Sequence, residues 1–309
     1  MMTNILVMIS ITLMYSAPLI LTALGGVISE RSGVINIGLE GMMTIGAFTA
    51  VAVTFNTNNP WLGLLCAGLA AGLLALLHGV ASITFCANQT ISGTALNFIG
   101  VGVALMLSRF VFDGATNTPP VQTKLPKILS WTDGDPSNPI FNTFNMDITV
   151  IISLFLAFVM WFVLYKTKWG LRVLAVGEHP TAADTLGINV FKIRYACVIL
   201  SGVLAGFGGA ARSIAVVSSF SPTVISGHGF IALAAVVFGK WTPQGAVAAC
   251  ILFGFAQALA VILGGSGTSI NIPTQLLAMI PYVLTIIVLI MFVGRASAPK
   301  ADGIPYKKN

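Results

Sequence analysis

The sequence has 309 residues, of which 56% are hydrophobic and only 8% are charged. Soluble domains usually carry about 25% charged residues, so this composition excludes a soluble protein and predicts an all-α polytopic membrane protein. We attribute the formal net charge of +6 to basic residues in cytoplasmic loops rather than to the binding of nucleic acid, because the cytoplasmic loops of membrane proteins carry an excess of Lys and Arg.

Nine apolar runs follow one another along the chain. A helix needs about 20 mostly apolar residues to cross the hydrocarbon core. The expected membrane segments are residues 5–27, 41–57, 61–86, 91–112, 147–165, 193–217, 229–240, 243–264 and 272–293. The seventh is too short to cross alone and Pro243 follows it, so we expect a half-helix or one part of a broken helix.

The charged residues between these runs predict an orientation. Residues 113–147 hold four aspartates against two lysines, whereas residues 166–194 hold five basic side chains. The positive-inside bias therefore places the second segment and the basic C-terminal tail in the cytoplasm. Nine crossings then put the N-terminus outside. We expect one transmembrane domain with two helical halves, 1–112 and 147–309, separated by an external loop at 113–146.

Each half contains one glycine-rich segment with polar residues. These are "SERSGVINIGLEGMMTIGAF" (29–48) and "SSFSPTVISGHGFIALAAVVFG" (218–239). Paired interruptions of this kind occur in transporters built from duplicated units, with the solute pathway between the halves. A chance match of two glycine-rich stretches is the alternative, and the sequence leaves both open.

The first glycine-rich segment raises the question of what Glu40 does beside an apolar run. Asn36 and Glu40 are four residues apart and would share a face of a helix. A face of this kind is costly against lipid, which predicts that both side chains line or gate a translocation path. In the alternative, Glu40 lies at a helix end and is held by backbone N–H groups or by Arg31.

Other polar side chains within the apolar runs have two interpretations. Asn97 and Gln257 are amides, which usually join membrane helices, although Asn97 is also a candidate for binding a polar solute. His228 lies between two glycines at the expected start of the half-helix and is a candidate pathway residue. Arg212 is expected to extend towards an interface.

A short cytoplasmic helix is expected within residues 170–192. In "GEHPTAADTLG" (177–187), Pro180 suits a first helical turn and Gly187 suits the position after the last. We expect the helix to expose Glu178, His179, Ala182, Ala183 and Asp184. Small residues let the groove of a partner close on the helix, so a docking element is the functional interpretation and a plain connector is the alternative.

Three blocks of the sequence resemble a known family. They are "SERSGVINIGLEGMMTIGAF", "AVGEHPTAADTLGINV" and "SGHGFIALAAVVFGKWTPQGAVAACILFGFAQAL". They resemble the membrane subunits of bacterial ABC importers in the branched-chain amino acid/ribose permease family, above all its nucleoside branch. The resemblance implies that a coupling helix enters a separate ABC ATPase, with the coupling residues Gly177, Glu178, His179, Pro180, Ala182, Ala183, Asp184 and Gly187.

The same resemblance implies the surroundings of the chain. A second permease subunit, identical or different, would complete a dimer in the lipid of the bacterial inner membrane. An extracellular binding lipoprotein would deliver the solute. The sequence has no GxxxxGK[ST] motif, so ATP is expected to bind to the partner ATPase, and we expect no cofactor on this chain.

No catalytic arrangement is apparent in the sequence. It has no HExxH motif and no paired carboxylates in the spans, and its four cysteines lie singly in apolar stretches, so neither an enzyme nor a metal site nor a disulfide is predicted. The function expected is ATP-driven import of nucleosides. A simple sugar or a branched-chain amino acid remains an alternative solute, and an ion-coupled secondary transporter is the rival class.

Overall fold

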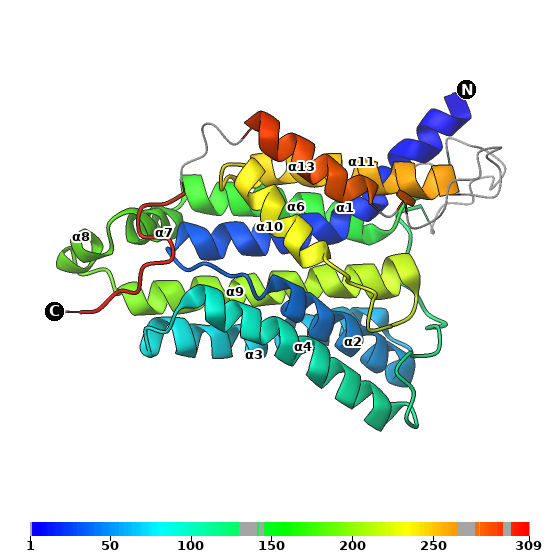
Figure 1. Ribbon diagram of the computed structural model, residues 1–309, viewed down its shortest axis with the longest axis horizontal. Coiled ribbons are helices and arrows are strands. Elements are labelled where there is room, and N and C mark those ends of the chain that lie inside the picture. The colour runs from blue at the N-terminus through cyan, green and yellow to red at the C-terminus, as the bar shows by residue number, and fades with distance from the viewer. Residues whose placement is uncertain are drawn as a thin grey trace.

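The computed structural model describes residues 2–129, 141, 145–264, 276–277, 279–292 and 298–308. Within these ranges every regular element is helical, which confirms the all-α class. Most long helices run roughly along the long axis of the molecule, and the start of α1 and the last described residues lie at opposite ends (Figure 1). Residues 112–129 lie at the end that holds the start of α1.

The elements follow the predicted runs closely. They are α1 (Met2–Arg31), α2 (Leu39–Thr57), α3 (Pro60–Gly79), η1 (Val80–Thr84), α4 (Gln89–Val111), α6 (Ile148–Lys166), α7 (Lys168–Glu178), α8 (Pro180–Thr185), α9 (Val190–Ala210), η2 (Ala211–Val217), α10 (His228–Phe238), α11 (Pro243–Gly264) and α13 (Ile280–Phe292).

Seven helices in the described part of the chain are long and apolar enough to cross a membrane. They correspond to seven of the nine predicted segments. The predicted half-helix is α10, which has only 11 residues. The ninth prediction, 272–293, lies partly outside the described residues, and its described portion includes α13. The estimate of about nine membrane segments is therefore approximate.

Asparagines set the starts of several helices. The side chain of Asn59 accepts hydrogen bonds from the amides of Trp61 and Leu62, with Pro60 in the first turn of α3. Asn88 and Asn189 cap α4 and α9 in the same way. A cap of this type typically stabilises a helix by about 0.5–2 kcal/mol, so these local signals fix where the helices begin after short loops.

The centre of the bundle is built on glycines that allow backbones to touch. A Cβ placed on Gly46 of α2 would lie 2.6 Å from the Cα of Gly206 in α9, and one on Gly206 would lie 2.5 Å from the carbonyl oxygen of Ala67 in α3. Close approach through small residues is how membrane helices associate without a hydrophobic driving force between them. It places α2 in the core.

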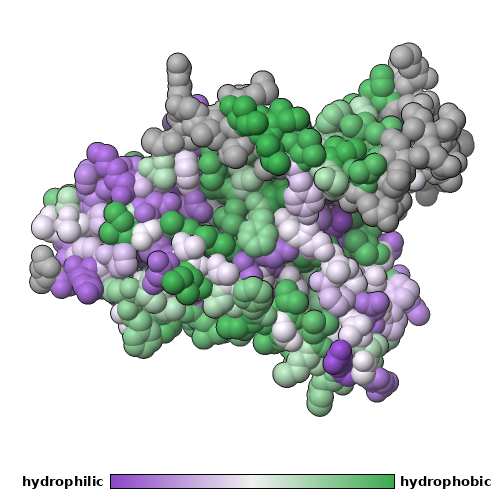
Figure 2. All heavy atoms as spheres, in the orientation of Figure 1, coloured by the Kyte–Doolittle hydropathy of each residue, from purple (hydrophilic) through white to green (hydrophobic). Residues whose placement is uncertain are grey.

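The surface matches a membrane environment. Large apolar side chains are exposed along α3 and α4, including Leu65, Leu69, Phe98 and Phe110. Hydrophilic residues gather at the end that carries α7, α8 and the last residues of the chain (Figure 2). A polar end next to an apolar bundle is the pattern expected when one end leaves the bilayer for water.

Candidate functional site

The glycine-rich segments of the two halves meet where α2 and α10 begin. Glu40 lies in the first turn of α2, and its carboxylate accepts hydrogen bonds from the backbone amides of Gly227 at 2.6 Å and Gly229 at 2.7 Å. The partial positive charge of a helix N-terminus favours a negative group at this position. Glu40 therefore caps α10, a helix 187 residues further along the chain.

Two glycines make this cap possible. Gly227 adopts a φ of +90°, in the left-handed region that side chains disfavour. At Gly229, a Cβ would lie 2.6 Å from the Cα of Glu40. Arg31, the alternative partner considered for Glu40, instead donates from Nε to the carbonyl oxygen of Trp241 at 2.7 Å. The carboxylate lies at a helix end, as one interpretation proposed, but the helix belongs to the other half.

Asn36 does not share a helix face with Glu40, which corrects the expectation from their spacing. Residues 34–38 form a loop, because Gly33 turns the chain with a φ of +88° and α2 begins only at Leu39. Asn36 is fully buried, and its Nδ2 donates to the hydroxyl of Ser201 at 2.9 Å. It joins this loop to α9.

Asn97 of α4 holds the start of α2 from the other side. Its Oδ1 accepts from the amide of Gly41 at 2.9 Å, and its Nδ2 donates to the carbonyl of Ile37 at 3.0 Å. Three residues further along α4, a Cβ on Gly100 would lie 2.5 Å from the carbonyl oxygen of Gly41. The amide of Asn97 therefore joins two elements in the way that amides within membrane helices usually do.

The four predicted pathway residues are gathered around two helix starts. Asn36, Glu40 and Asn97 surround the beginning of α2, and His228 is the first residue of α10, the helix that Glu40 caps. His228 also lines a cavity of about 350 Å³ between α1, η2, α10, α11 and α13. A pathway role for these four side chains stays a prediction.

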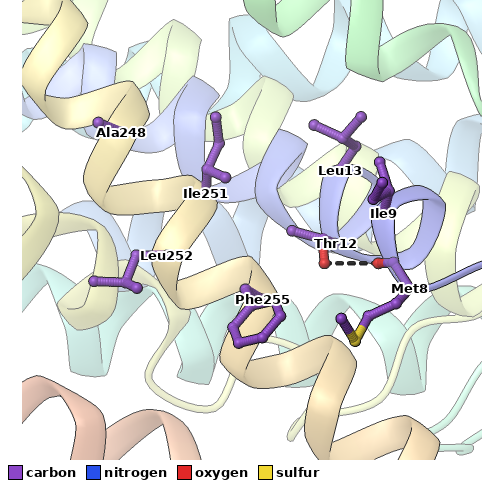
Figure 3. Close-up of a pocket in the computed structure, with 8 residues that line it drawn as sticks. All are labelled: Met8, Ile9, Thr12, Leu13, Ala248, Ile251, Leu252 and Phe255. Carbon is purple, nitrogen blue, oxygen red and sulfur yellow. Dashed lines mark hydrogen bonds between the residues drawn. The ribbon is translucent and has the colours of Figure 1, made fainter. Parts of the chain in front are cut away.

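A second hollow lies between α1 and α11 (Figure 3). Its volume is about 470 Å³. Its lining is Met8, Ile9, Thr12, Leu13, Ala248, Ile251, Leu252 and Phe255. The hydroxyl of Thr12 is bound to the carbonyl oxygen of Met8 at 2.7 Å. An apolar lining of this kind offers a polar solute no partner and suits a lipid chain.

The predicted short cytoplasmic helix is α8, which has six residues and starts at Pro180 as expected. Gly187 adopts a φ of +79° and ends it. His179 and Ala182 are exposed, while Glu178, Pro180 and Asp184 are partly exposed. The expectation that Ala183 is exposed is wrong. It is 2% exposed, because it lies on the inner side of this short helix and packs into the core.

Sequence reasoning missed Leu186, whose side chain is 81% exposed at the end of α8. A large apolar residue just before the helix-ending glycine was the available signal. Gly177 is buried at the other end of the segment, where a Cβ would lie 2.1 Å from the carbonyl oxygen of Arg31. The segment therefore presents an apolar tip on one side and packs against the end of α1 on the other.

Residues 298–308, here called the tail segment, tie this region together. The amide of Ala301 donates to the carbonyl of Gly177 at 2.9 Å. Buried Arg194 of α9 donates to the carbonyl of Ile304 at 3.0 Å and to that of Ser32 at 3.2 Å. The tail segment thus links the end of α7 to α9 and, through Arg194, to the turn after α1.

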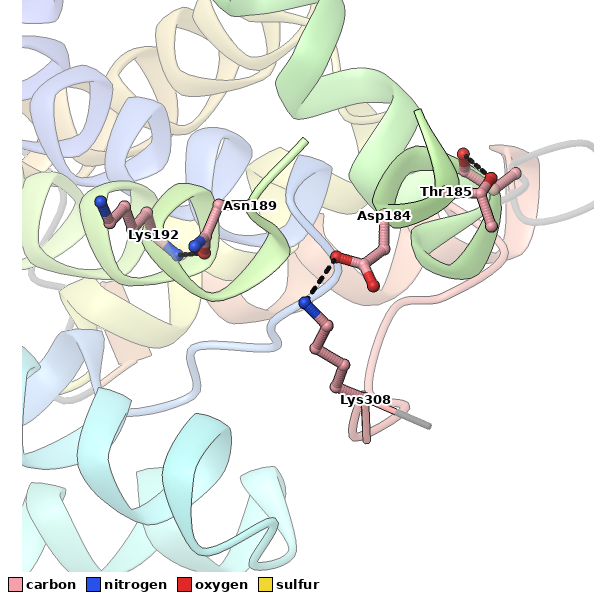
Figure 4. A network of polar contacts seen from close by, with 6 residues as sticks. Asp184, Thr185, Asn189, Lys192 and Lys308 are labelled. Atoms are coloured by element: carbon pink, nitrogen blue, oxygen red, sulfur yellow. Dashed lines mark hydrogen bonds and ion pairs between the residues drawn. The ribbon is translucent and has the colours of Figure 1, made fainter. Parts of the chain in front are cut away.

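The tail segment also reaches α8 directly. Lys308 Nζ lies 3.8 Å from Asp184 Oδ1, and the lysine extends towards the end of α8 (Figure 4). Its side chain is 66% exposed, and an ion pair in water typically contributes only about 0–1 kcal/mol. The buried hydrogen bonds made by Arg194 and Ala301 therefore dominate the docking of the tail segment.

Asp302 gives this docking a pH dependence. Burial raises its pKa from 3.8 to about 7, although the charge of Arg194 and a hydrogen bond from the amide of Gly303 act in the opposite direction. The Glu30 carboxyl interacts electrostatically with Asp302 as well. At a pH between these two pKa values, the Asp302 carboxyl is protonated when the tail segment is docked and ionised when the tail segment is released. Docking is therefore strongest at low pH and weakens as the pH rises from about 4 to 7.

We expect Asp302→Asn to abolish this pH dependence, because the amide stays neutral. In the wild type, docking should weaken by at most about 1.4 kcal/mol per pH unit in that window. The measurement is the rate of tryptic cleavage at Lys300 between pH 5 and 8, and the Asn variant corrects for the pH response of the protease. Identical pH profiles for the two proteins would contradict this account of Asp302.

Known proteins resemble the chain over nearly all its length. The family described as "Branched-chain amino acid transport system / permease component" matches residues 8–289. The guanosine ABC transporter permease protein NupQ of Bacillus subtilis is 47% identical, over 98% of this chain and 97% of its own. The nucleoside ABC transporter permease protein NupC of Lactococcus lactis subsp. cremoris is 44% identical, over 96% and 95%. The guanosine ABC transporter permease protein NupP of B. subtilis is 27% identical, over 79% and 71%.

Proposed function

We propose that this chain, which belongs to the branched-chain amino acid transport system permease family, is the transmembrane subunit of an ATP-driven importer of nucleosides. The observation that carries the proposal is the 47% and 44% identity, over almost the whole chain, to permeases whose names specify guanosine and nucleosides. The buried polar residues around the starts of α2 and α10 fit a chain that moves a polar solute.

The proposal includes three partners. NupQ and NupP are two different guanosine permeases of one organism, which supports a pair of unlike permeases as the membrane unit. A separate ABC ATPase would bind and hydrolyse ATP, and an external lipoprotein would deliver the nucleoside. The end of the molecule with α7, α8 and the tail segment would face the cytoplasm, which is supported by its basic residues and hydrophilic surface.

The contacts suggest how movement at α8 could reach the solute. The end of α7 packs on the end of α1 at Gly177, and the tail segment binds both Gly177 and Arg194. Arg194 holds Ser32 at the start of the loop that leads into α2. Glu40 then connects α2 to α10. A push on α8 would therefore be passed to the helix starts through packed backbone and buried hydrogen bonds.

Nucleoside uptake should require ATP hydrolysis by the partner ATPase. The expectation follows from the family of the chain together with the exposed tip of α8. The experiment compares uptake of labelled guanosine into vesicles that contain the whole complex with uptake into vesicles that contain this chain alone. The complex should take up guanosine only when ATP is present on the side of the membrane where the ATPase is bound. An excess of unlabelled glucose or leucine should not reduce this uptake.

Two results would contradict the proposal in different ways. Uptake by this chain alone on a proton or sodium gradient would favour the secondary-transporter class. Competition by glucose or leucine that is stronger than competition by nucleosides would keep the ABC permease but change its solute.

A further inference from the structure

The cavity that His228 lines has the composition of a small-molecule site. It measures about 350 Å³, and ligand pockets usually span about 300–1,000 Å³ with a mostly apolar lining and a few converging polar groups. Its lining is Tyr15, Arg212, Thr223, Val224, Ser226, His228, Ile231, Gln257, Ala260, Val261, Leu277, Pro281 and Tyr282. Residues from both halves of the chain contribute, since Tyr15 belongs to α1.

Arg212 supplies a partly exposed cation with spare hydrogen-bonding capacity. Its guanidinium lies over the ring of Tyr15, with Cζ 5.1 Å from the ring centroid, and its Nε donates to the carbonyl of Val224 at 3.4 Å. Its Nη1 is buried and finds no hydrogen-bond partner among the described residues. A buried donor without a partner costs free energy, and a ligand that carries acceptors would remove this cost.

The charge of the lining restricts the ligand. It contains the cation of Arg212 and no carboxylate among its described residues, so a cationic solute is disfavoured and an acceptor-rich solute, whether neutral or anionic, is favoured. Gln257, 8% exposed on α11, adds an amide that can both donate and accept. The guanidinium and the amide are planar groups that recognise the edges of nucleobases.

Two tyrosines add flat apolar surface to the cavity. Tyr15 lies under the guanidinium, and Tyr282 of α13 is held in place because its hydroxyl donates to the carbonyl of Ser226 at 2.9 Å. Bases stack on aromatic side chains with a gain of about 1–3 kcal/mol per base. The bond to Ser226 also joins Tyr282 to the loop just before α10, the helix that Glu40 caps.

We infer that this cavity binds the base of a 6-oxopurine nucleoside during transport. Arg212 would donate to the O6 and N7 acceptors of the base, an arrangement in which arginine favours guanine over adenine. Gln257 would bind a further edge of the base, and Tyr282 would stack on its face, since the ring of Tyr15 already faces the guanidinium. This assignment rests on the proposed function and adds to it a recognition site within the membrane domain.

The test uses the whole complex in vesicles and measures uptake of guanosine, inosine and adenosine at subsaturating concentrations. Arg212→Lys keeps the charge but loses the planar fork, so guanosine and inosine uptake should fall by about 5- to 150-fold while adenosine uptake falls much less. Gln257→Leu should reduce guanosine uptake by about 2- to 10-fold. Gln244→Leu is the matched control, because Gln244 lies on the same helix and lines a separate apolar groove.

Changes in preference separate recognition from structure. A variant that merely destabilises the fold lowers uptake of all three nucleosides by the same factor, after normalisation to assembled complex. If Arg212→Lys and Gln257→Leu both retain the wild-type ratio of guanosine to adenosine uptake, the cavity assignment is wrong while the transport function stands. If the wild-type complex takes up no nucleoside, the proposed function fails and the assignment fails with it.

Discussion

Leu186→Asp should separate the chain from the proposed partner ATPase while leaving the membrane domain folded. Leu186 is 81% exposed at the tip of α8, so the substitution removes few contacts within the chain. Burying a leucine in a partner's groove typically stabilises an interface by about 1.5–3 kcal/mol, and a carboxylate at the same place must be desolvated as well. We expect the affinity for the ATPase to fall by at least about 10- to 100-fold.

The measurement is co-purification of the ATPase together with its solute-stimulated hydrolysis. The neighbouring alanines provide a matched pair of controls. Ala182→Trp adds bulk on the exposed side of α8 and should weaken docking without loss of thermal stability. Ala183→Trp adds the same bulk on the buried side and should destabilise the chain itself, because the core there is already filled. If the Leu186→Asp variant shows the same co-purification and stimulated hydrolysis as the wild type, α8 is not part of the interface with the ATPase.

Glu40→Leu is expected to damage the junction of α2 and α10. It removes two hydrogen bonds to a charged acceptor, each worth about 1.5–3 kcal/mol, and leaves the amides of Gly227 and Gly229 without these partners. The sum, roughly 3–6 kcal/mol, is comparable with the whole net stability of many proteins. Thermal unfolding of the purified complex and uptake normalised to assembled complex should both fall sharply.

Glu40→Gln separates the structural role from a role in the solute pathway. The amide keeps one oxygen acceptor and nearly the same shape, so assembly should survive with a smaller loss of stability. If Glu40 also contacts the solute, uptake per assembled complex should fall in this variant. Uptake that falls only in proportion to the amount of complex would leave the cap as its sole role. Normal uptake and stability for Glu40→Leu would contradict both roles.

Local patterns predicted most of the fold. Hydropathy located the long helices, and Pro180 with Gly187 located α8, because span length and helix ends depend on neighbouring residues. Glycine spacing was less informative. The loop that holds Asn36 turns at Gly33 and continues to Leu39. The helical spacing therefore wrongly placed Asn36 and Glu40 on the same helix face.

The candidate site depended more on distant contacts. The partners of Glu40 lie 187 and 189 residues away, and no local pattern encodes them. The six residues of α8 are too few for periodicity to show which alanine faces inward. Arg194, predicted as a cytoplasmic charge, is 1% exposed because carbonyl groups of the tail segment and of the turn after α1 surround it.

The docked tail segment has a consequence for how the protein is made. The carbonyls of Ser32 and Gly177 belong to residues synthesised well before Ile304 and Ala301, the tail residues that complete this cluster. These contacts therefore form only after the chain has been synthesised as far as residue 304. A premature stop before residue 298 would leave all the long helices in place with Arg194 only partly bonded. A label inserted directly after Lys308 would begin beside Asp184 of α8, the helix that is proposed to dock on the ATPase.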